Sequence, residues 1–324
     1  MYRPLRTLLV SLLICLPNVL LVQVQAASVD AREKLIGTYS FVGFEIKDAN
    51  GNWIPDPNYT GNGYITYSDD GYMGVQIMPA DRKPFANNPP TPAEAQQAIQ
   101  GYIAYFGPFT MHANEGFVTH HRVGAISPGG AGDTTRFFDF EGNRLILTPP
   151  PASGNKEDAA RQVIWERMPN VALSAEAQKF VGTHQLMYTD RYAQRNDDLV
   201  RHDNRNDSDA GSYIIYTPTG HMMVHLMDKA GRTAYAGNAP TAEEALAAYR
   251  SYYGYFGRFT LYESATPPYV VHNQEGLLNP SGPVDTERLF QIGDGVLRLG
   301  PRPRLNNGEA TGTHLYWQTL PSLK

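Results

Sequence analysis

The decapeptide GYIAYFGPFT, residues 101–110, occurs a second time as SYYGYFGRFT, residues 251–260. The similarity continues on both sides of this stretch, with an offset that drifts only slightly along the chain. The further matches are YSDDGYMGVQIM (67–78) with YTPTGHMMVHLM (216–227), PTPAEA (90–95) with PTAEEA (240–245), residues 117–138 with 269–290, and Trp165 with Trp317. A repeat of this length predicts two whole domains rather than a solenoid.

The predicted domains span residues 33–168 and 180–319, separated by a polar, Ala-rich linker at 169–179. Each copy contains short segments that are rich in aromatic and β-branched residues and are bounded by turn residues, as strands are. In the first copy these segments are 37–46, 63–68, 72–78, 109–113, 116–125, 134–141, 144–149 and 162–168. The sequence therefore predicts about eight antiparallel strands in each domain.

One segment of each copy has a helical period instead. Thr91 is suited to cap a helix, Pro92 to its first turn, and Glu94 to complete a capping box. Thr241 and Glu244 repeat this box in the second copy. A single helix among eight antiparallel strands favours a small closed barrel, whose interior is filled by side chains or holds one small ligand.

We expect these helices to end at Gly107 and Gly257, so that the repeated decapeptide forms the helix exit. Tyr102, Tyr105 and Phe106 would then lie at helical spacing and pack the helix onto the sheet. In the alternative interpretation, the helix is a lid whose rings line the mouth of a ligand cavity.

The ordered motifs of the first copy resemble those of the bacterial and fungal lipocalin-like domain family. They are Gly37-Thr38-Tyr39, Tyr67 with Asp70-Gly71-Tyr72-Met73 and Gln76, Tyr102 with Tyr105-Phe106-Gly107, Val118 with His120, Pro128, Gly132, Arg136, and Trp165-Glu166-Arg167. The resemblance covers nearly all of 33–168 and, more loosely, 178–319. It implies an eight-stranded calycin-type barrel, but no single chemistry, because members of one fold differ in function.

The second copy departs from this pattern. Gln318-Thr319 replaces the Glu-Arg pair, His225 replaces Gln76, and Asn204–Gly211 is a polar insertion. The two barrels are therefore expected either to bind different molecules or to include only one active copy.

Alternation along the strands places a His, an Arg and a Tyr of each copy beside apolar neighbours. The shared faces are Val118, His120 and Arg122 with Val270, His272 and Gln274; Arg136 and Phe138 with Arg288 and Phe290; and Ile65 and Tyr67 with Ile214 and Tyr216. If these faces point into the barrels, each cavity holds a polar cluster in an apolar wall, the usual composition of a small-molecule site.

The predicted roles follow from the side chains. Arg136 would bind a carboxylate or enolate oxygen, His120 would act as general acid or base, and Tyr67 would donate to developing oxyanion charge. The same roles fall to Arg288, His272 and Tyr216. Structural roles are the alternative, with Arg136 paired to a carboxylate such as Glu166 or Glu45, and His120 bonded to backbone.

Eight further residues are predicted to line the ligand cavities. They are Tyr105, Phe138, Gln76 and Trp165 in the first copy, and Tyr255, Phe290, His225 and Trp317 in the second. No cofactor is expected, because the sequence lacks a Gly-rich phosphate loop and a Rossmann fingerprint. A metal at His112, His120 and His121 is disfavoured, because adjacent histidines on a strand face opposite ways.

Residues 1–26 are predicted to be a secretory signal peptide, which makes the mature protein secreted or periplasmic. Arg3 and Arg6 precede an apolar run, and VQA ends at Ala26, where or one residue later we expect cleavage. A retained membrane anchor is the alternative. The only cysteine, Cys15, lies in this segment, so the mature chain would contain no disulfide.

Loss of Arg3 and Arg6 changes the formal net charge from −5 to −7, and no basic stripe is present, so nucleic acid is not an expected partner. The leading functional hypothesis is binding or carriage of a small, largely apolar molecule. One form of this hypothesis gives the molecule an acidic group. The alternatives are a cofactor-free isomerase, cyclase or hydratase, and a pair of filled barrels that docks on a protein. Contact between the two barrels is compatible with each of these hypotheses.

Overall fold

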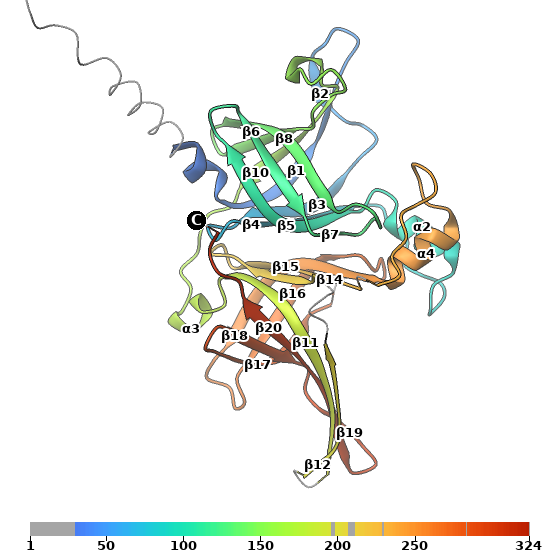
Figure 1. Cartoon of the computed structure of the whole chain (residues 1–324), viewed down its shortest axis with the longest axis vertical. Helices are drawn as coiled ribbons and strands as arrows, with labels where there is room; N and C mark the ends of the chain where they lie inside the picture. Colours follow the sequence, from blue (N-terminus) through green and yellow to red (C-terminus); the bar gives the residue numbers. More distant parts are fainter. Residues whose placement is uncertain (1–29, 196–197, 207–210, 229, 283, 324) are drawn as a thin grey trace, which may run out of the picture.

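The computed structural model describes residues 30–323 apart from 196–197, 207–210, 229 and 283, so the predicted signal peptide lies outside the described residues. The chain folds into two closed, eight-stranded antiparallel barrels stacked on each other (Figure 1). The fold class expected from the sequence is therefore confirmed.

The first barrel closes because β1 pairs with both β3 and β10. Its strands are β1 (Gly37–Lys47), β3 (Gly61–Tyr67), β4 (Tyr72–Pro79), β5 (Ile103–His112), β6 (Phe117–Arg122), β8 (Gly132–Glu141), β9 (Arg144–Thr148) and β10 (Arg161–Arg167). The short β2 (Trp53–Pro55) pairs with β1, and β7 (Gly124–Ala125) pairs with β5. A 3-10 turn, η1 (Lys156–Asp158), precedes β10.

The second barrel repeats this order and closes where β11 pairs with β13 and β20. Its strands are β11 (Gly182–Arg195), β13 (Tyr213–Tyr216), β14 (His221–Met227), β15 (Tyr252–Tyr262), β16 (Tyr269–Leu277), β17 (Thr286–Gly293), β18 (Val296–Gly300) and β20 (Glu309–Thr319). With β12 (Asp198–Asn206) and β19 (Arg304–Asn306), the end of β11 and the start of β20 form an arm that extends away from both barrels (Figure 1).

One helix precedes β5 and its equivalent precedes β15. In α2 (Pro92–Ile99) and in α4 (Ala242–Arg250), Thr and Glu side chains form the two predicted capping boxes. The helices lie side by side at one edge of the stacked barrels (Figure 1), where Gln96 Nε2 donates to the carbonyl of Pro240 at 2.8 Å. In the described part of the chain, no helix has the length and apolar composition needed to cross a membrane.

The expectation that these helices continue to Gly107 and Gly257 is wrong. Helix α2 ends at Ile99, and Gly101 follows with a φ of +73°, which turns the chain out of the helix. From Ile103 onward the decapeptide is strand β5, and its counterpart is β15. The aromatic spacing fitted a helix, but aromatic residues also favour strands, and pairing with the neighbouring strands prevails.

Gly107 and Gly257 are needed for strand pairing rather than for ending a helix. A Cβ atom on Gly107 would lie 2.1 Å from the carbonyl oxygen of His121, and one on Gly257 would lie 2.0 Å from that of Asn273. The neighbouring strands therefore approach closely at these points, and only glycine permits this.

The interior of the first barrel is a core of alternating strand residues. Its buried members include Tyr67, Val75, Phe109, Val118 and Trp165. Residues 30–35 are helical, and Leu35 is fully buried against this core. In the second barrel α3 (Ala175–Gln178), within the predicted linker, leads to Phe180, which is fully buried in the equivalent core.

The outer faces of β3, β4 and β5 pack against the outer faces of β13, β14 and β15. Phe106 illustrates this contact, since its ring centre lies 4.9 Å from that of Tyr213 and 4.8 Å from that of His225. On the same interface Tyr64 meets Phe256 edge to face at 5.2 Å. The chain thus contains an extensive, largely apolar contact between its barrels.

Candidate functional site

A buried tyrosine–histidine–tyrosine chain lies inside each barrel. In the first barrel His120 Nε2 is 2.7 Å from the Tyr67 hydroxyl, and Nδ1 is 3.1 Å from the Tyr105 hydroxyl. The second barrel repeats the arrangement, with Tyr216 at 2.8 Å and Tyr255 at 2.7 Å from the nitrogens of His272. The predicted residues of β3, β5 and β6 are thus brought together, as are those of β13, β15 and β16.

Strand register explains this convergence. His120 of β6 lies opposite Phe109 of β5 and opposite Thr134 of β8, so its side chain points inward between two neighbouring strands. Arg136 lies one inward position from Thr134 along β8 and is paired with Val118. In the second barrel His272 faces Thr286 and Val270 faces Arg288 in the same register.

Burial keeps the tyrosine and histidine side chains of each hydrogen-bonded chain uncharged. It lowers the pKa of His120 well below its usual value, and the positive charges of Arg136 and Arg122 lower it further. Burial, followed by the charge of Arg288, lowers the pKa of His272 to about 3. Burial likewise raises the pKa values of the four tyrosines, Tyr67, Tyr105, Tyr216 and Tyr255. At neutral pH both histidines are therefore neutral imidazoles between neutral phenols.

Each tyrosine–histidine–tyrosine chain has one O–H donor that is not used within the chain. A neutral imidazole carries one N–H, so one ring nitrogen donates and the other accepts. One tyrosine therefore donates its O–H to the histidine, and the other accepts from it. The accepting tyrosine keeps its own O–H for a further acceptor, and an oxygen atom of a bound molecule would serve.

Arg136 and Arg288 lie beside these chains with their charges uncompensated. Arg136 Nη1 donates to Thr134 Oγ1 and to the Thr135 carbonyl, both at 2.7 Å. Arg288 Nη1 donates to the carbonyl of Glu287 at 2.9 Å. Neither arginine forms a salt bridge within the residues that the structure describes. A guanidinium without a carboxylate partner offers its remaining N–H groups to an anion.

The structural alternatives for the first-barrel residues are only partly realised. Glu45 accepts a hydrogen bond from Gln162 Nε2 at 2.7 Å, and no described salt bridge joins it or Glu166 to Arg136. Both ring nitrogens of His120 are bonded to side chains, not to backbone. His120 is fully buried, however, so it also helps to fill the core.

Four of the predicted ligand-binding residues lie in the barrel cores. They are Phe138 and Trp165 in the first barrel, and Phe290 and Trp317 in the second. The indole nitrogens of both tryptophans are buried and have no hydrogen-bond partner among the described residues. These aromatic side chains form part of the apolar interior of each barrel.

Gln76 and His225 are not in either barrel interior. Gln76 Nε2 donates to the carbonyls of Val224 at 2.8 Å and Tyr255 at 3.1 Å, and its Oε1 accepts from Tyr102 at 2.6 Å. His225 Nδ1 lies 2.6 Å from the Tyr252 hydroxyl. These two equivalent positions therefore lie in the barrel–barrel contact, not at the clusters around His120 and His272.

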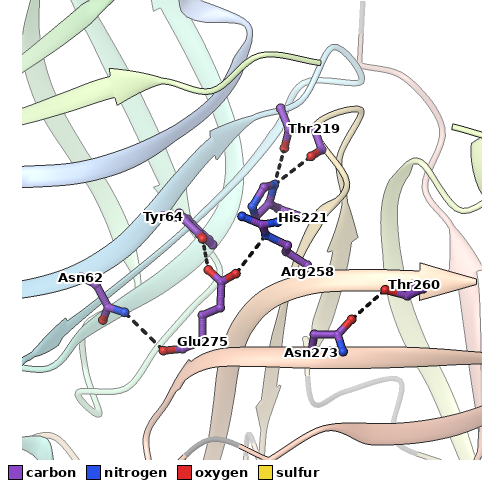
Figure 2. A network of polar contacts seen from close by, with 8 residues as sticks. All are labelled: Asn62, Tyr64, Thr219, His221, Arg258, Thr260, Asn273 and Glu275. Atoms are coloured by element: carbon purple, nitrogen blue, oxygen red, sulfur yellow. Dashed lines mark hydrogen bonds and ion pairs between the residues drawn. The ribbon is translucent and has the colours of Figure 1, made fainter. Parts of the chain in front are cut away.

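A charged network at this contact was not predicted from the sequence. Glu275 accepts a hydrogen bond from Tyr64 of the other barrel and forms a salt bridge with Arg258 at 3.2 Å (Figure 2). Its carbonyl accepts from Asn62 at 3.2 Å. His221, drawn beside it, donates through Nδ1 to the Thr219 carbonyl at 2.9 Å (Figure 2). No local motif marks Glu275, because two of its partners, Asn62 and Tyr64, come from the other domain.

The three histidines considered for a metal are separated. His120 points into the barrel, whereas His121 points outward and pairs with Asp133 at 2.8 Å. His112 stacks on Phe117 with ring centres 4.2 Å apart. Among the described residues, no group of three or more His, Cys, Asp or Glu side chains is arranged to hold a metal ion.

A cleft of about 680 Å³ opens between the starts of the two barrels. Two of its charged side chains, Arg167 and Asp70, already bind other groups of the protein. Arg167 donates to Tyr39 at 2.8 Å and to the carbonyl of Lys34, and Asp70 accepts from the backbone N–H of Thr183 at 3.0 Å. The cleft therefore presents less free binding capacity than the arginines inside the barrels.

Three comparisons relate the chain to known proteins, and one of them, a family model, agrees with this architecture. A search of the curated proteins found no match. Among solved structures, the chain is similar to a protein with unknown function from the DUF3598 family of Nostoc punctiforme PCC 73102, with 10% identity and a TM-score of 0.21, over 89% of this chain and 97% of that one. The model of the lipocalin-like domain family matches residues 36–168 and 181–319. Because these two segments make up most of the chain, it belongs to the lipocalin-like domain family.

Proposed function

We propose that the barrels bind a small, largely apolar molecule that carries an acidic group, and that the chain is a binding or carrier protein. A lipocalin-like barrel is suited to ligand binding in general. The specific proposal rests on one observation: each barrel holds an arginine without a described carboxylate partner, beside a tyrosine–histidine–tyrosine chain and within an apolar core.

The donors in this cluster match an oxyanion. A guanidinium donates N–H groups in a fixed plane, and the accepting tyrosine of the chain has an O–H to spare. Hydrogen bonds to charged oxygens are about twice as strong as those between neutral groups. Phe138 and Trp165, with their second-barrel counterparts, would contact the apolar part of the molecule.

Binding has more support than acid–base catalysis by an isomerase, cyclase or hydratase. Both ring nitrogens of His120 and of His272 are occupied by tyrosines. Burial also lowers the pKa values of both histidines, whereas an efficient general base has a pKa near the working pH. The same geometry favours a ligand site over barrels that serve only to dock on a protein, since such barrels need no uncompensated arginine.

The proposal includes a location outside the cytoplasm, in the periplasm or the medium. It depends on residues 1–26 acting as a cleaved signal peptide. Sequencing the amino terminus of the protein recovered from its native cells tests this. A mature chain beginning at Ala27 or Ser28 supports the location, and a chain that retains Arg3 and Arg6 contradicts it.

Native mass spectrometry tests the binding proposal. The protein is purified from its own compartment without detergent, alongside an Arg136→Met, Arg288→Met double variant. A small acidic molecule is expected on the unmodified protein and not on the double variant. The matched control is Arg144→Met, an exposed arginine in the first barrel, which should keep the molecule. Loss in the control as well, or retention in the double variant, would contradict the proposal.

A further inference from the structure

The two clusters differ at one inward-facing position. Two residues beyond the cluster histidine, the first barrel has Arg122 and the second has Gln274. The remaining groups of the cluster are the same in both barrels, since each has two tyrosines, one histidine, one threonine and one arginine. Gln274 in place of Arg122 removes one positive charge from the site, while these five groups stay the same.

In the first barrel two arginines act on one tyrosine. The Arg122 guanidinium carbon lies 5.8 Å from the centre of the Tyr105 ring, and its Nε donates to the Gly132 carbonyl at 3.1 Å. The charges of Arg136 and Arg122 both offset the rise that burial causes in the pKa of Tyr105. Arg122 forms no salt bridge among the described residues, and the acid that acts on it, Asp133, is itself paired with His121.

In the second barrel the equivalent group is a neutral amide with an unmet hydrogen-bonding need. Gln274 is only 7% exposed. Its Oε1 accepts from the backbone N–H of Val284 at 3.2 Å, but its buried Nε2 has no partner within the described residues. A buried donor left unpaired is unfavourable, and a native structure that contains one calls for an acceptor.

We propose that this position sets the headgroup preference of each barrel. The first barrel takes an anionic headgroup such as a carboxylate, held between Arg122 and Arg136. The second has Arg288 as the one arginine of its cluster, so it binds an acidic headgroup more weakly and prefers a neutral oxygen headgroup, a hydroxyl or carbonyl, which accepts from Gln274 and Arg288. The inference rests on the proposed function, because it presupposes a ligand in each barrel.

The test uses two probes of equal chain length, octanoate and 1-octanol, titrated calorimetrically into the purified full chain. The unmodified protein is expected to have one tight octanoate site. Arg122→Gln should weaken this site by about tenfold, because it removes a charge-assisted hydrogen bond. Gln274→Arg should create a second tight octanoate site and weaken binding of 1-octanol. The double variant Arg122→Gln, Gln274→Arg should again have one tight octanoate site.

Two further variants assign the tight site to a barrel. Arg136→Met should remove it, whereas Arg288→Met should leave it in place. Arg122→Lys keeps the charge and should retain tight octanoate binding. This variant and Arg122→Gln keep the test decisive if the buried arginine of Gln274→Arg prevents folding.

The outcomes separate the two proposals. If octanoate binds but Arg122→Gln keeps the tight site, or if both barrels bind octanoate equally, this inference is wrong and the proposed function stands. If neither probe binds the unmodified protein or any of these variants, the proposed function fails, and the inference fails with it.

Discussion

Arg82 and Arg232 occupy equivalent positions in the two repeats, and each donates hydrogen bonds to backbone carbonyls of the opposite barrel. Arg82 donates from Nη1 to Leu277 at 2.6 Å and from Nη2 to Leu278. Arg232 donates from Nη2 to Ala125 and Ile126, both at 2.7 Å. Because the acceptors are also equivalent residues, the contact is self-complementary, like the interface of a symmetric dimer.

We therefore predict that the barrels unfold as one unit and that removing these arginines separates them. Arg82→Met leaves buried carbonyls without a donor and should lower the free energy of unfolding by about 2 kcal/mol. The Arg82→Met, Arg232→Met double variant should unfold in two steps in urea, followed by circular dichroism. Exposed Arg144→Met should have no effect. A single, unshifted transition in the double variant would show that the apolar contact alone holds the barrels together.

The sequence predicted the barrels because the repeat and the turn residues are local signals, but it misplaced the end of each helix. Tyr105 and Phe106 fit a helical spacing, and they also fit a strand in which one residue points inward and the next outward. Tyr105 does point to His120, whereas Phe106 packs on the other barrel. Only pairing with strands distant in sequence decides between a helix and a strand here.

Alternation along a strand also decided which part of the site could be predicted from the sequence. Alternation on β6 separates His120 from His121, so the inward residue can be recognised. Strand β4 is buried at every position from Tyr72 to Ile77, because one face lines the barrel and the other meets the second barrel. A strand that is buried on both faces does not alternate between apolar and polar residues, so its sequence does not show which side chains point inward. Gln76 therefore could not be assigned to the barrel–barrel contact from the sequence.

Adding a methyl group at Gly107 should destabilise the first barrel. The new Cβ of Gly107→Ala would lie 2.1 Å from a backbone oxygen of β6, so the strands must separate. We expect the free energy of unfolding to fall by about 1–3 kcal/mol, the usual penalty for overpacking. Gly257→Ala should behave alike, whereas Gly43→Ala, which has no atom within 4 Å, is the matched control. Equal urea midpoints for all three variants would contradict the role assigned to Gly107.

Removing one hydroxyl from the buried chain should also lower stability. Tyr67→Phe leaves Nε2 of His120 without its partner in a fully buried setting, and the expected loss is about 1–3 kcal/mol. Tyr216→Phe should have the same effect through His272. The control is Tyr262→Phe, at a residue that is 45% exposed. Urea unfolding at pH 7 measures all three, and a Tyr67→Phe variant as stable as the control would mean that this hydrogen bond contributes nothing net.

The buried histidines predict how stability changes with pH. Burial lowers the pKa of His225 from its usual 6.5 to about 3, so below pH 6.5 the unfolded chain binds a proton that the folded chain does not. Its contribution to stability is complete above pH 6.5. It is lost as the pH falls from 6.5 towards 3, by about 1.4 kcal/mol per pH unit.

His225→Gln introduces the residue found at the equivalent position, Gln76. It removes the pH-dependent contribution of His225 to stability. Between pH 6 and pH 4, its free energy of unfolding should fall less steeply than that of the unmodified protein, by about 1 kcal/mol per pH unit. The comparison is made by urea unfolding at pH 7, 6, 5 and 4. Gly43→Ala, which changes no titratable group and has no atom within 4 Å of its new Cβ, is the control and should keep the original slope. If His225→Gln also keeps that slope, His225 is accessible to protons in the folded protein, and the barrel–barrel contact opens more readily than its packing implies.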